Sequence, residues 1–108
     1  MHGLHLTADL HRCDGDPRLL TDAAALRQLC IVSVGACGLH AVAELFHPFD
    51  AAGGVTGVVL LAESHVAVHT WPERGAVTLD VYVCNLGRDN AENASALLQA
   101  LIDAFAPQ

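Results

Sequence analysis

The segment Ala76–Cys84 alternates strictly between two sets of residues, and this pattern strongly limits how the chain can fold. The apolar set stands at every second position: Val77, Leu79, Val81 and Val83. A β-strand places such residues on one face and the intervening residues on the other. The segment therefore predicts a strand in a sheet that buries one face against other elements.

Four further segments predict strands for the same sheet. Residues 3–10 alternate between apolar and polar types, and residues 40–47 and 66–69 have the length and composition of strands. Residues 56–62 form a continuous apolar run, which is typical of a central strand. We therefore expect five strands, the last four of them consecutive.

Two segments carry helical signals. The first runs from Thr21, a candidate N-cap, to about Ala36, and Gly38 can end it. The second follows Asp89 or Asn90 as its cap, and its apolar residues recur at helical spacing: Ala94, Leu97, Leu98, Leu101, Ile102 and Phe105. This stripe predicts an amphipathic helix that packs on the sheet.

The element order β-α-β-β-β-β-α predicts an α+β fold. Two helices packed against a mainly antiparallel sheet make a two-layer sandwich. The sequence has 108 residues with no linker, repeat or low-complexity segment, so we expect a single domain over residues 1–108.

Charge and hydropathy narrow the classes of partner. Five Lys and Arg against twelve Asp and Glu give a net charge of −7. This disfavours nucleic acid, whose phosphates are bound by clustered basic residues. The chain is 53% hydrophobic, a high fraction for so small a domain. We therefore expect an oligomer in which a partner chain covers apolar surface.

Neither a membrane span nor an export signal is expected. Polar residues interrupt the richest apolar stretches, 30–45 and 53–68, whereas a spanning helix needs about 20 consecutive apolar residues. The N-terminus has no basic region followed by a long apolar region. The four cysteines include no CxxC pair, so we expect reduced thiols in a cytoplasmic protein.

The polar run Glu63–Glu73 holds the densest set of chemically capable side chains. His65 and His69 would lie about 13 Å apart along a strand, which is too far for one zinc ion, so no metal site is predicted. Ser64, His69 and Asp80 are types that form a hydrolase triad, but the G-x-S-x-G pattern is absent. From residue types alone, a turn with capping polar groups is the favoured interpretation.

The same run, with its neighbours, resembles a known family. Gly54–Glu73, followed by Leu79-Asp80-Val81 and Cys84, closely resembles the prokaryotic S-adenosylmethionine decarboxylase proenzymes. The shared pattern is an E-S-H turn, an H-T-W-P-E segment and a strand that ends in cysteine. This pattern is far more specific than a lone short motif. The resemblance covers residues 3–105.

The resemblance implies a self-cleaving proenzyme. The Ser64 hydroxyl would attack the carbonyl of Glu63, the chain would be cut between these two residues, and Ser64 would become a covalent pyruvoyl cofactor. Its ketone would form a Schiff base with the substrate amine and accept the electrons released with carbon dioxide. The implied reaction decarboxylates S-adenosylmethionine to supply aminopropyl groups for spermidine. The implied assembly is a homodimer, or a larger oligomer, with sites near the subunit interface.

Individual roles follow from the same resemblance. His69 matches the histidine that moves protons during processing, and Thr56 matches a hydroxyl residue that assists it. Cys84 matches the cysteine that returns a proton to the product carbon. The candidates for substrate binding are Phe49, Trp71 and Glu73. The Phe49 ring would stack on adenine, and the Glu73 carboxylate would hold the ribose hydroxyls.

Two alternatives stay open. Arg74, Ala76 and Asn85 stand where the family usually has other residues, an aromatic and a glycine among them. Changes beside the substrate carboxylate are compatible with a pyruvoyl-dependent ornithine or arginine decarboxylase, whose substrate is also cationic. The other alternative is an unprocessed, non-catalytic paralogue, which would have no reason to keep the reactive serine, histidine and cysteine.

Overall fold

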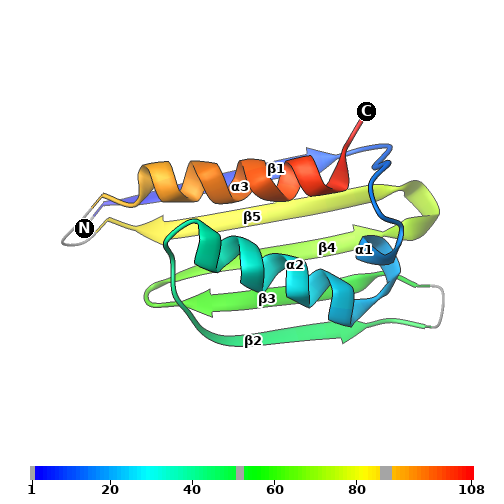
Figure 1. The fold of residues 1–108 in the computed structure, drawn as a ribbon, viewed down its shortest axis with the longest axis horizontal. Coiled ribbons are helices and arrows are strands. Elements are labelled where there is room, and N and C mark those ends of the chain that lie inside the picture. Colours follow the sequence, from blue (N-terminus) through cyan, green and yellow to red (C-terminus); the bar gives the residue numbers. More distant parts are fainter. Residues whose placement is uncertain (1, 51–52, 86–88) are drawn as a thin grey trace.

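The computed structural model describes residues 2–50, 53–85 and 89–108. Its strands are β1 (Gly3–Leu10), β2 (Ala41–Pro48), β3 (Val55–Leu61), β4 (Ser64–Trp71) and β5 (Ala76–Cys84). They form one sheet in the order β1-β5-β4-β3-β2, and every neighbouring pair is antiparallel (Figure 1).

The helices all cover the same face of this sheet (Figure 1). They are α1 (Arg18–Thr21), α2 (Ala23–Ala36) and α3 (Ala91–Phe105). Helix α3 packs along β1 and β5, whereas α2 packs over β2 and β3. The predicted two-layer α+β sandwich is therefore confirmed, with the other face of the sheet left open.

Most strand predictions are confirmed, with differences at the ends. The predicted limits of β1 and β5 agree with the structure, but β4 extends beyond residues 66–69 to Ser64 and Trp71. The ladder explains this, since Ser64 pairs with Leu61 and Trp71 pairs with Ala76. The edge strand β2 continues one residue past the predicted end to Pro48, a place where the missing N–H of proline is tolerated.

The predicted helix caps need correction. Thr21 ends the short helix α1, which was not predicted, and Asp22 caps α2 instead. The carboxylate of Asp22 accepts hydrogen bonds from the first free N–H groups of α2, at 2.9 and 3.3 Å. At α3, the Asp89 carboxylate accepts from the N–H of Ala91 at 2.8 Å, while the Asn90 side chain makes no capping bond.

The covered face of the sheet holds the hydrophobic core. Fully buried side chains of α3, such as Leu97, Leu101 and Phe105, pack against the inward valines of the strands. Burial of one such side chain stabilises the fold by about 1.5–3 kcal/mol. Buried Thr70 ties this layer together, because its hydroxyl accepts from the N–H of Val55 at 2.8 Å and donates to the carbonyl of Leu20 at 2.7 Å.

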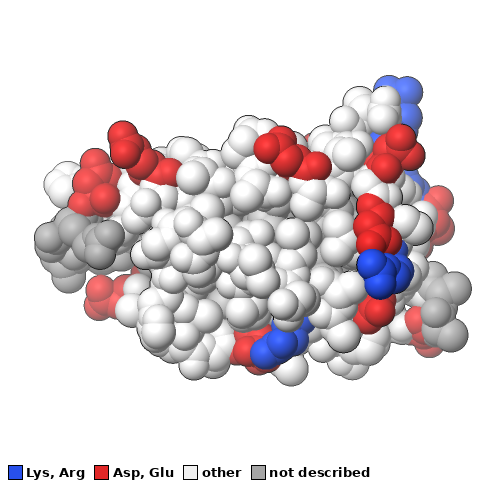
Figure 2. Space-filling view, in the orientation of Figure 1, with Lys and Arg blue, Asp and Glu red and all other residues white. Residues whose placement is uncertain are grey.

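Figure 2 shows the surface on the helix side of the molecule. Asp and Glu side chains lie mainly around its edges, with few Lys or Arg among them, and uncharged residues fill the middle. Among the helices of the described residues, none has the length and apolar character needed to cross a membrane.

Candidate active site

The turn between β3 and β4 contains the predicted cleavage point. Because Leu61 pairs with Ser64, the loop consists of only Ala62 and Glu63. Glu63 has a φ of 56°, in the left-handed region that glycine or asparagine usually occupies in such turns. This conformation costs a residue with a Cβ about 1–2 kcal/mol. The bond between Glu63 and Ser64 therefore follows a strained residue.

Cys84, at the end of β5, lies beside this turn. Its backbone N–H donates a hydrogen bond to the Ser64 hydroxyl oxygen at 3.2 Å. Both residues border a pocket of about 280 Å³, lined by Gly38, Leu39, His40, Leu61, Ala62, Glu63, Ser64, Cys84 and Asn90. The fold thus brings together three predicted site residues that lie up to 21 positions apart: Glu63, Ser64 and Cys84.

Asn90 and His40 line the same pocket, and the sequence analysis did not assign either residue to a site. The Asn90 side-chain amide donates to the carbonyl of Cys84 at 3.0 Å, and this bond holds the end of β5 in place. Asparagine before a helix is an ordinary capping residue. Nothing in the sequence therefore indicates that the Asn90 side chain bonds to the end of β5. His40 belongs to no recognisable motif either. It reaches the pocket because it directly precedes β2.

Cys84 and Cys30 are both buried free cysteines, but their surroundings differ. Cys30 lies on the buried face of α2, where burial raises the pKa of its thiol to about 12 and keeps it protonated and inert. Cys84 is only 7% exposed but borders the pocket that Ser64 lines. The Cys84 thiol can therefore contact a small molecule bound in this pocket.

His69 lies toward the other end of β4, and Thr56 lies beside it on β3. They face each other across β3 and β4, and the Thr56 hydroxyl is 3.1 Å from the His69 Nδ1. The ring of Trp71 lies 6.0 Å from that of His69. Ser64 is five residues away, about 16 Å along the strand. Within one chain, the predicted processing residues therefore pair with each other but not with the serine.

The remaining substrate-binding candidates share this distal end. Glu73, in the short turn after Trp71, borders a second pocket of about 590 Å³, whose lining is His11, Trp71, Glu73, Arg74 and Ala76. Phe49 follows β2, is 52% exposed, and its ring lies 4.8 Å from that of His47. In Figure 1 this end of the sheet lies on the right, opposite the turn that contains Ser64.

A Ser–His–Asp triad does not form. The carboxylate of Asp80 contacts His5 and His65, whereas His69 contacts Thr56. The carboxylate is therefore not used to orient a histidine toward Ser64. His5 was assigned no role from the sequence, because 60 positions separate it from His65 and no spacing rule connects them.

The chain is similar to known proteins of one family. Residues 4–108 match the S-adenosylmethionine decarboxylase family. An S-adenosylmethionine decarboxylase proenzyme of Aquifex aeolicus is 43% identical over 82 residues, which are 76% of this chain and 58% of that protein. A proenzyme of the same description from Thermococcus onnurineus is 34% identical over 104 residues, 96% of this chain and 72% of that protein.

A solved structure shares the fold. The crystal structure of the adenosylmethionine decarboxylase from Aquifex aeolicus matches with a TM-score of 0.84 and 33% sequence identity. The match covers 98% of this chain and 82% of that one. The chain spans 58% of the length of the curated Aquifex relative.

Proposed function

The chain belongs to the S-adenosylmethionine decarboxylase family, and we propose that it is a self-processing, pyruvoyl-dependent decarboxylase of S-adenosylmethionine. The single observation that carries this proposal is the left-handed Glu63 directly before Ser64, next to Cys84. A glutamate has no local reason to occupy a turn position that favours glycine. Backbone strain at such a position is typical of functional sites.

The turn supports cleavage between Glu63 and Ser64. Attack of the Ser64 hydroxyl on the Glu63 carbonyl replaces the peptide bond by an ester and frees the Ser64 amine. β-Elimination then breaks the Cβ–Oγ bond, which releases residues 1–63 as a carboxylate and leaves a dehydroalanine. Addition of water and loss of ammonia produce the pyruvoyl ketone. The N–H of Cys84 donates to the Ser64 oxygen and so helps to hold this hydroxyl beside the turn for attack.

The residues around Ser64 fit a pyruvoyl group. The pocket that Ser64 and Cys84 share has the size of a small ligand site, and it opens at the cleavage point. Once formed, the group supplies a ketone that binds the substrate amine and withdraws electrons as carbon dioxide leaves. Cys84 borders the same pocket, which supports its role as the proton donor to the product carbon, and the Asn90 amide donates to its carbonyl.

The remaining site residues support a homodimer. His69 and Thr56 lie about 16 Å along β4 from Ser64, so one chain does not bring them to its own cleavage point. A second copy packed against the open sheet face, with a two-fold axis across the strands, would place its His69 end over the Ser64 end of the first. Phe49, Trp71 and Glu73 would arrive with it to bind the adenosine.

The open face has the character of an interface between copies. A single chain leaves Leu45 69%, Leu60 45% and Trp71 40% exposed. Monomeric proteins rarely leave such apolar surface on an uncovered sheet. Burial of this surface by a second copy explains the high hydrophobic content of so small a domain.

Substitution of Ser64 by Ala tests the processing step. The purified wild-type protein is expected to give two chains, of 63 and 45 residues, by intact mass. Ser64→Ala lacks the nucleophile and is expected to stay as one chain of 108 residues. Ser95→Ala, at an exposed position of α3, is the control that should cleave normally. A Ser64→Ala protein that still splits would contradict the proposed cleavage point.

Release of carbon dioxide identifies the substrate. Processed protein is supplied in turn with carboxyl-labelled S-adenosylmethionine, ornithine and arginine. Release from S-adenosylmethionine alone is the expected result. Turnover of ornithine or arginine instead would make the protein an amino-acid decarboxylase on the same scaffold. A chain that neither cleaves nor releases carbon dioxide would be a non-catalytic member of the family.

A further inference from the structure

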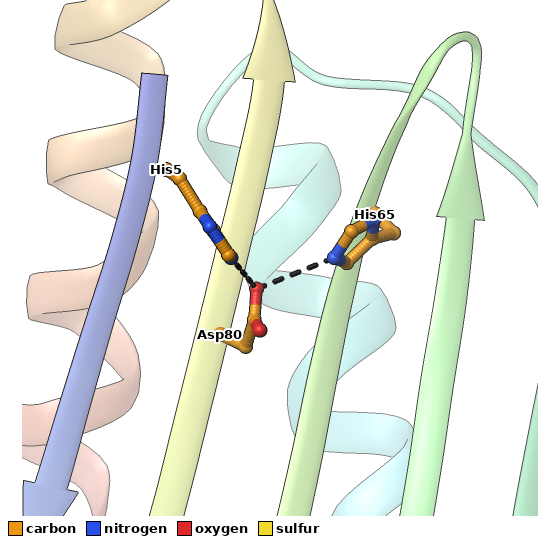
Figure 3. Close-up of side chains that lie close together, drawn as sticks. All are labelled: His5, His65 and Asp80. Carbon is orange, nitrogen blue, oxygen red and sulfur yellow. Dashed lines mark hydrogen bonds and ion pairs between the residues drawn. The ribbon is translucent and has the colours of Figure 1, made fainter. Parts of the chain in front are cut away.

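His5, His65 and Asp80 meet on the open face of the sheet, and none of them lines either pocket. They come from β1, β4 and β5, and Figure 3 shows their side chains converging on this face, with the helices behind the sheet. The Nε2 atoms of His5 and His65 lie 2.5 and 3.2 Å from the same Asp80 oxygen. The three ligand atoms lie within 4.8 Å of one another.

The register of the sheet holds this cluster in place. His5 and His65 are the two cross-strand partners of Tyr82, one on each side. Both imidazoles pack against its ring, with centroids 5.9 Å away in each case. Asp80 lies two residues from Tyr82 on the same face of β5. Its partner on β4 is Ala67, whose small side chain leaves room beside the carboxylate.

We propose that His5, His65 and Asp80 bind a divalent transition-metal ion, for which Zn²⁺ is the best fit. Two imidazole nitrogens and one carboxylate oxygen are ligands that zinc accepts, and water can complete the coordination. Magnesium and calcium prefer sites made of oxygen ligands alone. The net charge of −7 also favours uptake of a cation.

The geometry needs little adjustment to accept the ion. Tetrahedral ligands about 2 Å from zinc lie about 3.3 Å from one another. The separation of His65 and Asp80 is already 3.2 Å. The contact between His5 and Asp80 has to lengthen by about 0.8 Å, which a rotation of the His5 side chain, half-exposed in a single chain, can provide. A bound ion would join the edge strand β1 to the two strands beside it.

Titration of the metal-free full-length protein with ZnCl₂ tests this proposal. Calorimetry is expected to show one zinc ion per chain. Asp80→Asn and His65→Gln should each weaken binding by about 100-fold or more, above the loss typical of an outer-shell partner. His11→Gln, at an exposed position outside the cluster, is the matched control and should bind as the wild type does. Co²⁺ should give visible absorption without a thiolate charge-transfer band, which separates this site from the cysteines.

The proposal would be overturned if the wild type bound no zinc, or if Asp80→Asn bound zinc as tightly as the wild type. Hydrogen bonds alone would then hold His5, His65 and Asp80 together. Long-range ¹H–¹⁵N spectra of the wild type keep the test valid even if the variants fail to fold. Zinc is expected to shift Nε2 in two of the seven imidazoles, those of His5 and His65. Shifts at other histidines instead would also overturn it. None of these measurements depends on cleavage or decarboxylation.

Discussion

At the Ser64 end of β4, a two-residue turn, a strained glutamate and the end of β5 surround one hydroxyl group. At the Trp71 end, seven residues along, an exposed histidine and a half-buried threonine lie on the open sheet face beside an exposed tryptophan. The first end holds the nucleophile, and the second holds the histidine and threonine predicted to assist processing. This difference between the two ends supports the proposal that one chain carries two half-sites, which a second copy would join.

The largest expected effect comes from mixing two inactive variants. Ser64→Ala and His69→Ala are each expected to remain uncleaved when expressed alone. When the two are co-expressed, half of randomly formed dimers are mixed and each carries one intact site, so about a quarter of wild-type activity should return. Intact mass should then show cleaved chains that carry only the His69→Ala substitution. If no chain is cleaved in the mixture, His69 does not act on the Ser64 of a partner.

The next effect concerns the surface that would join the half-sites. The double variant Leu45→Glu/Leu60→Glu puts charges on the open face, where burial in a dimer would leave them unpaired. It should elute as a monomer and cleave about tenfold more slowly or worse, since a charged residue at an interface centre costs more than 1.4 kcal/mol. Val32→Glu, at a 55% exposed position on α2, is the control and should remain dimeric. A double variant that stays dimeric would place the interface elsewhere.

A third prediction compares how the two ends are supported. Thr70→Val removes the hydroxyl beneath the Trp71 end and leaves the N–H of Val55 and the carbonyl of Leu20 without a partner. The free energy of unfolding should fall by about 1–3 kcal/mol in denaturant titrations of the uncleaved Ser64→Ala protein. Thr7→Val, at an exposed position of β1, should change it by less than about 0.5 kcal/mol. Equal effects of the two variants would show that Thr70 is not a special support.

The smallest expected effect is relief of strain at the Ser64 end. Glu63→Gly removes the cost of the left-handed conformation but adds backbone entropy to the unfolded chain. In the Ser64→Ala background, the free energy of unfolding should rise by about 0.5 kcal/mol. Ala62→Gly, at the neighbouring position without a positive φ, should lower it instead. A loss of stability in both variants would show that Glu63 stores no strain.

Much of the fold could be predicted because its signals are local. The alternation of Ala76–Cys84 and the apolar stripe after Asn90 report directly which side chains face the core. The prediction of the α2 cap was wrong because two neighbouring residues both have the type of a helix cap. Thr21 and Asp22 are both good caps, and only the short helix α1, which ends at Thr21, leaves the capping position to Asp22.

The candidate site could be predicted in part. The residue pattern around Ser64 identified its own turn and the cysteine that follows, and the structure places these together. Strand spacing alone separates His69 from Ser64 by about 16 Å, but it could not show that His69 pairs with Thr56 of the neighbouring strand. Nor could it connect Asn90 to the carbonyl of Cys84, a contact made by an ordinary capping residue.

The sequence by itself determined the strands, the amphipathic helix, the reactive turn and the family, since each depends on residues that are neighbours in the chain. Only the tertiary structure decided which distant residues meet. Antiparallel register brings Cys84 to Ser64 and brings His5 and His65 to Asp80. The length of β4 keeps His69 at the opposite end. The physical reason is that contacts across a sheet depend on register and strand order, which the cooperative packing of the whole chain selects.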